Sequence, residues 1–414
     1  MPRTGFDSSV AKSAPLGSGG EVSSARVASR AKKPDTEERR RIQAFRQASQ
    51  HLTKPLPRKS WLEAARYGLR TTTPGAIGTA LLARVQGFSP DELSRALEKE
   101  KSLLLVYSLG HGSYAVPTKE AALFTRGLFP SDDAALEHLL ALALQKTKLP
   151  ARKLFDSVLR EVPRALSRGP LSKNDLHAVL KKALPKSFLM WCAPCNSHHL
   201  SPIALRTAGF SGTFCFVPRH GTESYFVRTD RWLGAPFEGS DGTSDDEHHA
   251  SLARRHFHGY APSSARELAK WSGISPTEAR RAFEAIEDEL GEARSGEAFV
   301  LKKDRALYES PPEPSGVRLL PPYDPYLMQA DRDRLLPDKA LQKRVWRTLS
   351  NPGVVLVDGE IAAVWKAEKK GKRLLVRFEP FAKLSSKTRS AIAEASEALA
   401  PFRDSASTEP TFIA

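Results

Sequence analysis

Apolar residues between Leu171 and Trp232 recur first with the spacing of an α-helix and then with the alternation of β-strands. After Ser172, one helical face is apolar, and its members are Leu176, Val179, Leu180 and Leu184. A second short helix is expected after Ser201. Two alternating runs follow, Thr213–Val217 and Ser224–Val227, and the turn residues between them predict a β-hairpin. Helix, helix and hairpin are the order of elements in a winged helix.

The same order occurs on both sides of this stretch. Upstream, helical segments at Ala76–Val85 and Asp91–Lys99 precede two apolar strands at Leu103–Ser108 and Tyr114–Val116. Downstream, Ser275 begins a helix that follows another helix and has one apolar stripe, Ala279, Phe283, Ile286 and Leu290. Short strands are expected there at residues 298–302 and 306–308. The pattern therefore predicts three copies of one unit.

The last part of the chain has the pattern of a small β domain. The runs Val354–Val357 and Ile361–Trp365 flank Asp358-Gly359, a strong signal for a two-residue hairpin turn. A further strand, Leu374–Phe378, precedes a closing helix at Ser385–Ala398. The predicted fold class is α+β, with three tandem winged-helix units and a C-terminal β-rich domain. The predicted boundaries are residues 57–150, 151–233 and 247–310 for the winged-helix units and 316–404 for the β-rich domain.

The first 56 residues have a different composition from the rest. Residues 1–60 contain 13 Lys and Arg against 5 Asp and Glu, with many Ser, Ala and Gly. We predict a mostly disordered basic arm at residues 1–56, with a helix around Glu37–Ser49. The Gly- and Asp-rich segment Gly234–Asp246 is expected to be a linker.

The whole chain has 63 Lys and Arg against 47 Asp and Glu, a net charge of +16. Such an excess favours a polyanion, and double-stranded DNA is the partner that we expect; the alternative is a basic surface that serves solubility. No run approaches the ~20 apolar residues that span a bilayer, so no membrane partner is expected. The three cysteines form no disulfide framework, which favours the cytoplasm.

Cysteine and histidine are concentrated in one short segment. Cys192 and Cys195 form a CxxC pair, and His198 and His199 follow directly. Two thiolates and a nearby imidazole are common zinc ligands, so a structural zinc site is one hypothesis. The alternative is a pair of packed thiols ahead of a helix, because a second ligand pair is missing unless Cys215 folds back onto the segment. No other cofactor, and no small-molecule cofactor, is expected.

The candidate DNA contacts of the central unit are basic residues on its second helix and hairpin. They are Arg206, Arg219, His220 and Arg228. In the third unit, acidic residues share the exposed side with Arg280 and Arg281, which favours a packing role. The Asp- and Arg-rich run at residues 318–334 contains a candidate catalytic carboxylate, but local ion pairs are the favoured interpretation.

Several stretches together resemble the AlkZ-like (YcaQ-type) winged-helix DNA-binding proteins, a family that includes DNA glycosylases for bulky alkylated bases and crosslinks. The stretches are Leu69–Phe88, Leu103–Phe124, Trp191–Gly209, Ala269–Leu290, Leu319–Leu336 and Val355–Gly359, with Trp365 and Glu379–Phe381. The resemblance extends from about Trp61 to Phe402. It implies three tandem winged helices around a concave DNA-binding face, closed by a C-terminal β domain.

The resemblance also carries two motifs of the glycosylases onto this chain. The Gln-x-Gln or Gln-x-Asp signature, which positions the attacking water, falls on Arg70-Thr71-Thr72. In ungapped register the Arg-Gly-x-x-His strip falls on residues 110–114, where Tyr114 takes the place of the histidine. In a shifted register, His111 takes that place instead. Arg70 cannot accept a hydrogen bond and Thr72 is no general base, so no catalytic residues are expected at these positions.

The leading hypothesis is therefore a double-stranded DNA-binding winged-helix protein without glycosylase activity, in which His111 joins the candidate DNA contacts. The first alternative is a monofunctional DNA glycosylase of DNA repair that uses Tyr114, His111 or an Asp from residues 324–333. The second alternative is a zinc-stabilised structural or interaction protein.

Overall fold

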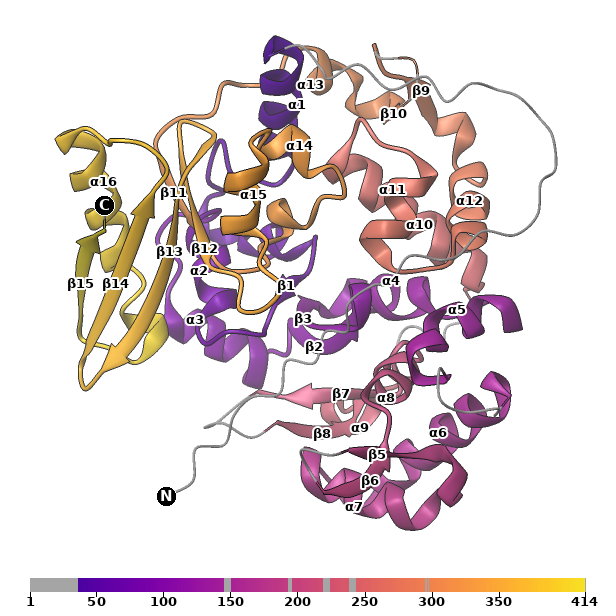
Figure 1. The fold of residues 1–414 in the computed structure, drawn as a ribbon. Helices are drawn as coiled ribbons and strands as arrows, with labels where there is room; N and C mark the ends of the chain where they lie inside the picture. Colours follow the sequence, from indigo (N-terminus) through magenta and orange to yellow (C-terminus); the bar gives the residue numbers. More distant parts are fainter. Residues whose placement is uncertain are drawn as a thin grey trace.

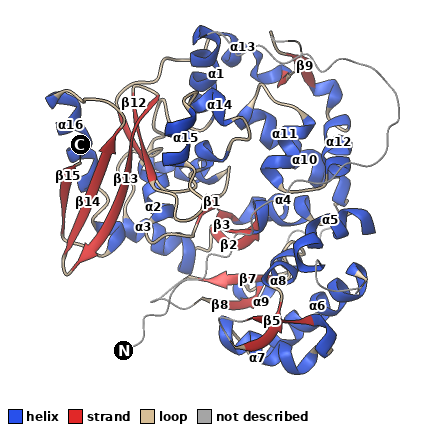
Figure 2. Cartoon of the chain, viewed as in Figure 1, coloured by secondary structure: helices blue, strands red, loops and turns tan. Residues whose placement is uncertain are grey.

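The computed structural model describes residues 36–413, except residues 145–149, 193–195, 219–223, 238–242, 295 and 297. Helices and strands are interleaved along the chain, so the fold is α+β as predicted (Figure 2). In Figure 1 a sheet of long strands at the C-terminal end lies on one side of a body of helices and short strands. No helix in the described part of the chain is long and apolar enough to cross a membrane.

The helices up to the middle of the chain are α1 (Thr36–Ser49), α2 (Ala76–Leu82), α3 (Pro90–Ser94), α4 (Ala121–Thr125), α5 (Asp133–Leu144), α6 (Ala151–Ala165), α7 (Lys173–Ala183), α8 (Pro202–Gly209) and α9 (Thr229–Leu233). The later helices are α10 (Asp245–Tyr260), α11 (Ala265–Ser272), α12 (Pro276–Glu284), α13 (Arg305–Glu309), α14 (Arg332–Leu335), α15 (Lys339–Val345) and α16 (Ser386–Glu397).

The hairpins predicted for the first and second units join into one sheet. Its strands, in spatial order, are β1 (Leu69–Arg70), β3 (Gly112–Pro117), β2 (Leu103–Ser108), β7 (Phe214–Val217), β8 (Tyr225–Arg228) and β4 (Leu171–Ser172). The units meet where Leu105 on β2 pairs with Phe216 on β7. The ring of Tyr107 packs edge-on against Phe216, with ring centroids 4.7 Å apart. Pairing β2 with β7 covers an edge of each hairpin that would otherwise be exposed.

The boundary expected between the first two units, at residue 150, is wrong for α5. Its residues Leu136 and Leu140 are fully buried in a hydrophobic cluster with Phe155 of α6 and Leu180 of α7. Helix α5 therefore contributes to the core of the second unit, while its Leu139 lies in the cluster that the first and third units share. The apolar residues of α5 must be covered to be removed from water, and α6 and α8 pack against this helix.

The third unit shares its core with the first. One cluster contains Leu104 and Phe124 of the first unit together with Phe257, Leu268 and Ile286 of the third. Its two-stranded sheet pairs β9 (Leu290–Glu292) with β10 (Phe299–Leu301).

The strand expected at residues 306–308 of the third unit is wrong, because this segment is helix α13. Tyr308 in α13 is fully buried, and its ring packs edge-on against Phe45 at a centroid distance of 5.7 Å. A contact with the start of the chain thus decides the conformation of this segment.

The C-terminal domain is a five-stranded sheet that α16 packs against. Its strands are β11 (Val317–Leu320), β12 (Gly353–Val357), β13 (Glu360–Lys370), β14 (Arg373–Pro380) and β15 (Ser407–Phe412). The predicted Asp358-Gly359 turn is confirmed, with positive φ of 47° and 82° at its two residues. Strand β15 pairs in parallel with β14 and lies beyond residue 404, so the domain is longer than predicted.

The prediction of a disordered arm is wrong for residues 36–56, and residues 1–35 lie outside the described residues. The helix expected around Glu37–Ser49 is α1, and Phe45 and Arg46 on it are 0% and 1% exposed. Helix α1 contacts α10, α13 and α14, which come from distant parts of the sequence. It is a core element of the fold.

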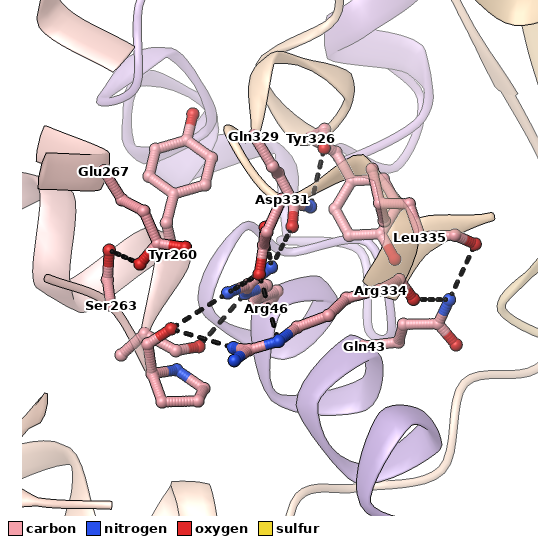
Figure 3. A network of polar contacts seen from close by, with 12 residues as sticks. Gln43, Arg46, Tyr260, Ser263, Glu267, Tyr326, Gln329, Asp331, Arg334 and Leu335 are labelled. Carbon is pink, nitrogen blue, oxygen red and sulfur yellow. Dashed lines mark hydrogen bonds and ion pairs between the residues drawn. The ribbon is translucent and has the colours of Figure 1, made fainter. Parts of the chain in front are cut away.

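A buried polar network holds α1 in place (Figure 3). Arg46 donates to the carbonyl oxygens of Ala261 and Pro262, each at 3.1 Å, and binds both carboxylate oxygens of Asp331 at 2.8 and 3.1 Å. Gln43 donates to the carbonyl oxygen of Leu335 at 3.0 Å. The side-chain donors of Gln43 and Arg46 are thus satisfied by backbone and carboxylate acceptors, as buried polar groups require.

Candidate nucleic-acid interface

The strand pairing places Arg70 directly opposite Tyr114. The two residues are register partners on β1 and β3, so their side chains leave the same face of the sheet. The guanidinium Cζ of Arg70 lies 5.0 Å from the ring centroid of Tyr114 and 5.2 Å from that of Tyr323. Arg70 donates a long hydrogen bond of 3.4 Å from Nη1 to the Tyr114 hydroxyl. The side chain is therefore held between two aromatic rings, which favours a cation.

The backbone around this cluster is adapted to it. Gly112 lies on the same strand face as Tyr114, and a Cβ at Gly112 would come within 1.5 Å of Arg70 Nη1. Tyr323 has a φ of +60°, in the left-handed region that a bulky residue rarely adopts. The space for the guanidinium and the position of the second ring both depend on these two backbone features.

The other two residues of the motif have different surroundings. The Thr71 amide donates to the Ser113 carbonyl at 3.2 Å, and the Thr71 hydroxyl donates to the Ser113 hydroxyl at 2.8 Å. Thr72 is exposed. An arginine stays protonated and a threonine hydroxyl is a poor base, so neither Arg70 nor Thr72 can take a proton from water. Tyr114 is buried, with 2% of its surface exposed.

His111 lies where the first two units meet. It has a φ of +60°, and its Nε2 is 3.0 Å from the Thr207 hydroxyl oxygen of α8. That hydroxyl already donates to the Ile203 carbonyl at 2.9 Å, so His111 Nε2 is assigned as the donor to Thr207. The pKa of His111 is lowered to about 4, mainly by burial and secondly by the charge of Arg206. The imidazole is neutral near pH 7.

The basic residues that were predicted to contact DNA differ in burial and in their ion pairs. Arg206 is half-buried beside His111, with its Cζ 6.0 Å from the ring centroid of Tyr107. Arg228 is bound by Asp230 at 2.6 and 3.0 Å and lines a pocket of about 610 Å³ with Arg126 and Phe237. Arg219 and His220 lie outside the described residues. Of the predicted contacts, the structure brings His111 and Arg206 together.

The cysteine and histidine segment forms a small sheet that the sequence did not predict. Strand β5 (Leu189–Cys192) pairs with β6 (Ser197–Leu200), so Cys192 and the histidines lie on strands and not at the start of a helix. Cys192 faces Ser197, and His199 faces Met190, which places Cys192 and His199 on one side of the pair. His198 is on the other side, with its ring 5.1 Å from the exposed Trp191.

The zinc hypothesis stays a prediction, because Cys195 lies outside the described residues. Among the residues that are described, no group of three or more His, Cys, Asp or Glu is arranged to hold a metal. His177 of α7, which sequence reasoning missed, packs against His199 with ring centroids 5.5 Å apart. Cys215 is on β7 in a different sheet, and burial raises the pKa of its thiol to about 12. That thiol is a core group.

The carboxylates proposed for the alternative glycosylase mechanism are engaged in ion pairs. Asp324 binds Arg84 in the core, Asp331 binds Arg46, and Asp333 binds Lys339. Tyr323, which sequence reasoning did not assign to the site, is the residue of this region that reaches Arg70. No sequence pattern links the two positions, because they lie in segments that come together only in the fold.

Comparisons with known proteins agree with the resemblance. The model of the family described as "DNA glycosylase AlkZ-like" matches residues 64–402. Among solved structures, the DNA glycosylase AlkZ of Streptomyces sahachiroi matches with a TM-score of 0.70 and 17% sequence identity, over 90% of this chain and 99% of that chain. At this identity the likeness shows a common fold. The sequence matches none of the curated proteins.

Proposed function

The chain belongs to the AlkZ-like family of DNA glycosylases, and from this premise we propose that it binds double-stranded DNA without excising bases. The observation that carries the proposal is the Arg70-Thr71-Thr72 segment. At the position of the water-orienting signature it has a cation held between Tyr114 and Tyr323, and an exposed Thr72. Hydrolysis of a glycosidic bond needs a group that takes a proton from the attacking water; Arg70 is a donor only, and the hydroxyl of Thr72, which can accept a hydrogen bond, is too weak a base to take the proton.

The distribution of charge supports DNA as the partner. Residues 151–237, which include helices α6 to α9, contain 13 Lys and Arg against 5 Asp and Glu. The net charge of this segment is +8, and a concentrated positive field favours a polyanion. Arg206 beside His111 is our first candidate for a phosphate contact, because it forms no ion pair with a carboxylate among the described residues.

We also propose that the three repeated units are winged helices. In each, helices precede a pair of strands: β2 and β3, β7 and β8, and β9 and β10. A winged helix places its second helix in the major groove, a role that falls to α8, the helix of Arg206, in the second unit. The third unit has a packing role in this proposal, because Arg281 is paired with Asp132 at 3.3 Å. The cytoplasm is the proposed location, as the cysteine content suggests.

Two measurements test the proposal. A gel titration of duplex DNA at rising salt should show binding whose log K falls linearly with log salt, by about 0.9 for each phosphate contacted. Incubation with duplexes that carry alkylated bases, followed by alkali, should give no strand breaks. A family member that retains the glutamine signature serves as positive control. Breaks above background would make the protein a glycosylase, and failure to bind at low salt would remove the DNA-binding role.

A further inference from the structure

Arg70 is a half-buried cation that has no counter-charge among the residues that the structure describes. Two other arginines in the core have carboxylate partners: Arg46 binds Asp331 and Arg84 binds Asp324. In the described part of the chain Arg70 has no carboxylate partner, and its single hydrogen bond is the 3.4 Å contact with Tyr114. Its Nε is buried and has no hydrogen-bond partner there. Buried charge and unsatisfied donors are costly, and each such group in a folded protein needs an explanation.

The surroundings of Arg70 hold the cation in place. The rings of Tyr114 and Tyr323 contact the guanidinium, and Gly112 leaves the space that Nη1 fills. Tyr323 contributes its ring from a strained backbone conformation, with a φ of +60°. Strain of this kind persists where the surrounding structure imposes it, and it is concentrated at binding sites. A cation without an anionic partner is thus fixed in advance of any ligand.

The chemistry of the cluster selects an anion with paired oxygen atoms. The guanidinium of Arg70 is a donor only, so it binds a ligand that accepts hydrogen bonds. With Nε buried, the terminal nitrogens are the donors that remain for a ligand. A planar guanidinium matches a phosphate group through two parallel hydrogen bonds, and neighbouring aromatic rings leave those donors available.

We propose that Arg70 binds one phosphate of the DNA backbone, at the position where the family's signature carries a water-orienting amide. The inference rests on the proposed function, because it assigns the ligand of that same site. It makes the substitution at residue 70 a change of role, from positioning a water molecule to anchoring the strand. Arg70 then contributes to affinity and to register on the duplex, and not to sequence preference.

The test compares wild type with Arg70→Gln on otherwise identical short duplexes, each with one phosphate replaced by an uncharged methylphosphonate. Wild type should lose affinity by about tenfold at one backbone position, where the charge-assisted bonds to Arg70 are removed. Arg70→Gln should be weaker on the native duplex by a similar factor, insensitive at that position, and unchanged at the others. Its salt slope should be smaller by about 0.9. Arg70→Lys, which keeps the charge but not the planar fork, should lie between the two.

Arg66→Gln is the matched control, because Arg66 is in the same unit and is already paired with Glu63 and Glu120. It should keep the wild-type slope. Thermal unfolding in inorganic phosphate and in chloride at equal ionic strength provides a second arm. If phosphate stabilises wild type but not Arg70→Gln while DNA binding ignores the substitution, the site takes free phosphate, and the backbone assignment is overturned.

The outcomes separate this inference from the proposed function. If wild type binds DNA with a normal salt slope and folded Arg70→Gln behaves identically, the Arg70 contact is wrong and DNA binding stands. If wild type does not bind DNA at any salt, both fail. A folding defect in Arg70→Gln is recognised by its melting curve, and the methylphosphonate profile of wild type and of Arg70→Lys then decides the assignment.

Discussion

Arg84 and Asp324 form a bidentate ion pair that is closed to solvent, although 240 residues separate them in the sequence. The two hydrogen bonds are 2.7 and 2.8 Å long, and the side chains are 1% and 0% exposed. Arg84 also donates to the carbonyl oxygen of Gln50 at 3.0 Å, and Asp324 accepts from the Tyr326 amide at 3.0 Å. The pair joins the segment that follows α2 to the segment that contains Tyr323.

Asp324→Asn should therefore act on stability and not on chemistry. Removing one member of a buried ion pair leaves the other charge unpaired and typically costs about 3–5 kcal/mol. Denaturant unfolding of Asp324→Asn should show a loss of that size. The double variant Arg84→Met, Asp324→Leu should recover much of it, because it buries no charge. An Asp324→Asn variant as stable as wild type would contradict the structural role and return Asp324 to the list of candidate catalytic bases.

Two arginines of the second unit, Arg206 and Arg228, should differ in their effect on DNA binding. Arg206→Ala should weaken duplex binding and lower the salt slope by about one phosphate contact, because Arg206 has no carboxylate partner among the described residues. Arg228→Ala should have a smaller effect, since Asp230 already neutralises this side chain. Asp230→Asn should strengthen binding by releasing Arg228. Equal losses for both arginine variants, with no gain for Asp230→Asn, would contradict this ordering.

His111 should make the protein less stable as the pH falls. Its pKa is about 4 in the folded chain and about 6.5 when unfolded, so the unfolded state binds the proton first. The contribution of neutral His111 to the free energy of unfolding is complete above about pH 6.5. It is lost as the pH falls toward 4, and the total loss is about 3 kcal/mol. His111→Gln, which keeps a side-chain donor but does not titrate, should show a shallower fall of unfolding free energy over this range. An unchanged pH profile would show that His111 is protonated without penalty.

Local signals in the sequence predict the starts of several helices correctly. Ser275 and Glu278 form the capping box that their spacing predicts, with hydrogen bonds of 3.2 Å in both directions. Ser172 caps α7 with its hydroxyl, which accepts from the Asp175 amide and donates to the Asp175 carboxylate. Such elements depend on residues three or four positions apart, so a short window of sequence contains the information that determines them.

The errors arose where distant segments meet. Gln43, Arg46 and Gln47 of α1, and Gln50 directly after it, are spaced as on one helical face, a pattern typical of a solvated surface. Their partners are oxygen atoms more than 200 residues away, as for Arg46 with Ala261 and Asp331 and for Gln47 with the Tyr326 hydroxyl. Polarity alone does not reveal that an acceptor exists. The pairing of β2 with β7 through Leu105 and Phe216 is likewise set by packing between units.

The candidate site was predictable in part for the same reason. The family resemblance placed Arg70 and Tyr114 at two motif positions, and strand register then made them neighbours. Tyr323 came to the site from a loop whose backbone conformation no pattern announces. The surroundings of Arg70 depend on this third residue. The sequence alone shows only that Arg70 replaces the glutamine of the family's signature.

The C-terminal sheet carries a repulsive pair that can be reversed. Lys366 and Arg377 are exposed register partners on β13 and β14, so like charges stand directly opposite each other. Arg377→Glu should raise the unfolding free energy by roughly 0.2–1 kcal/mol, because an attractive cross-strand pair replaces a repulsive one. Lys372→Glu, in the turn of the same hairpin, makes the same change in net charge without a cross-strand partner and should leave stability nearly unchanged. A gain of equal size in both variants would assign the effect to net charge and not to the pair.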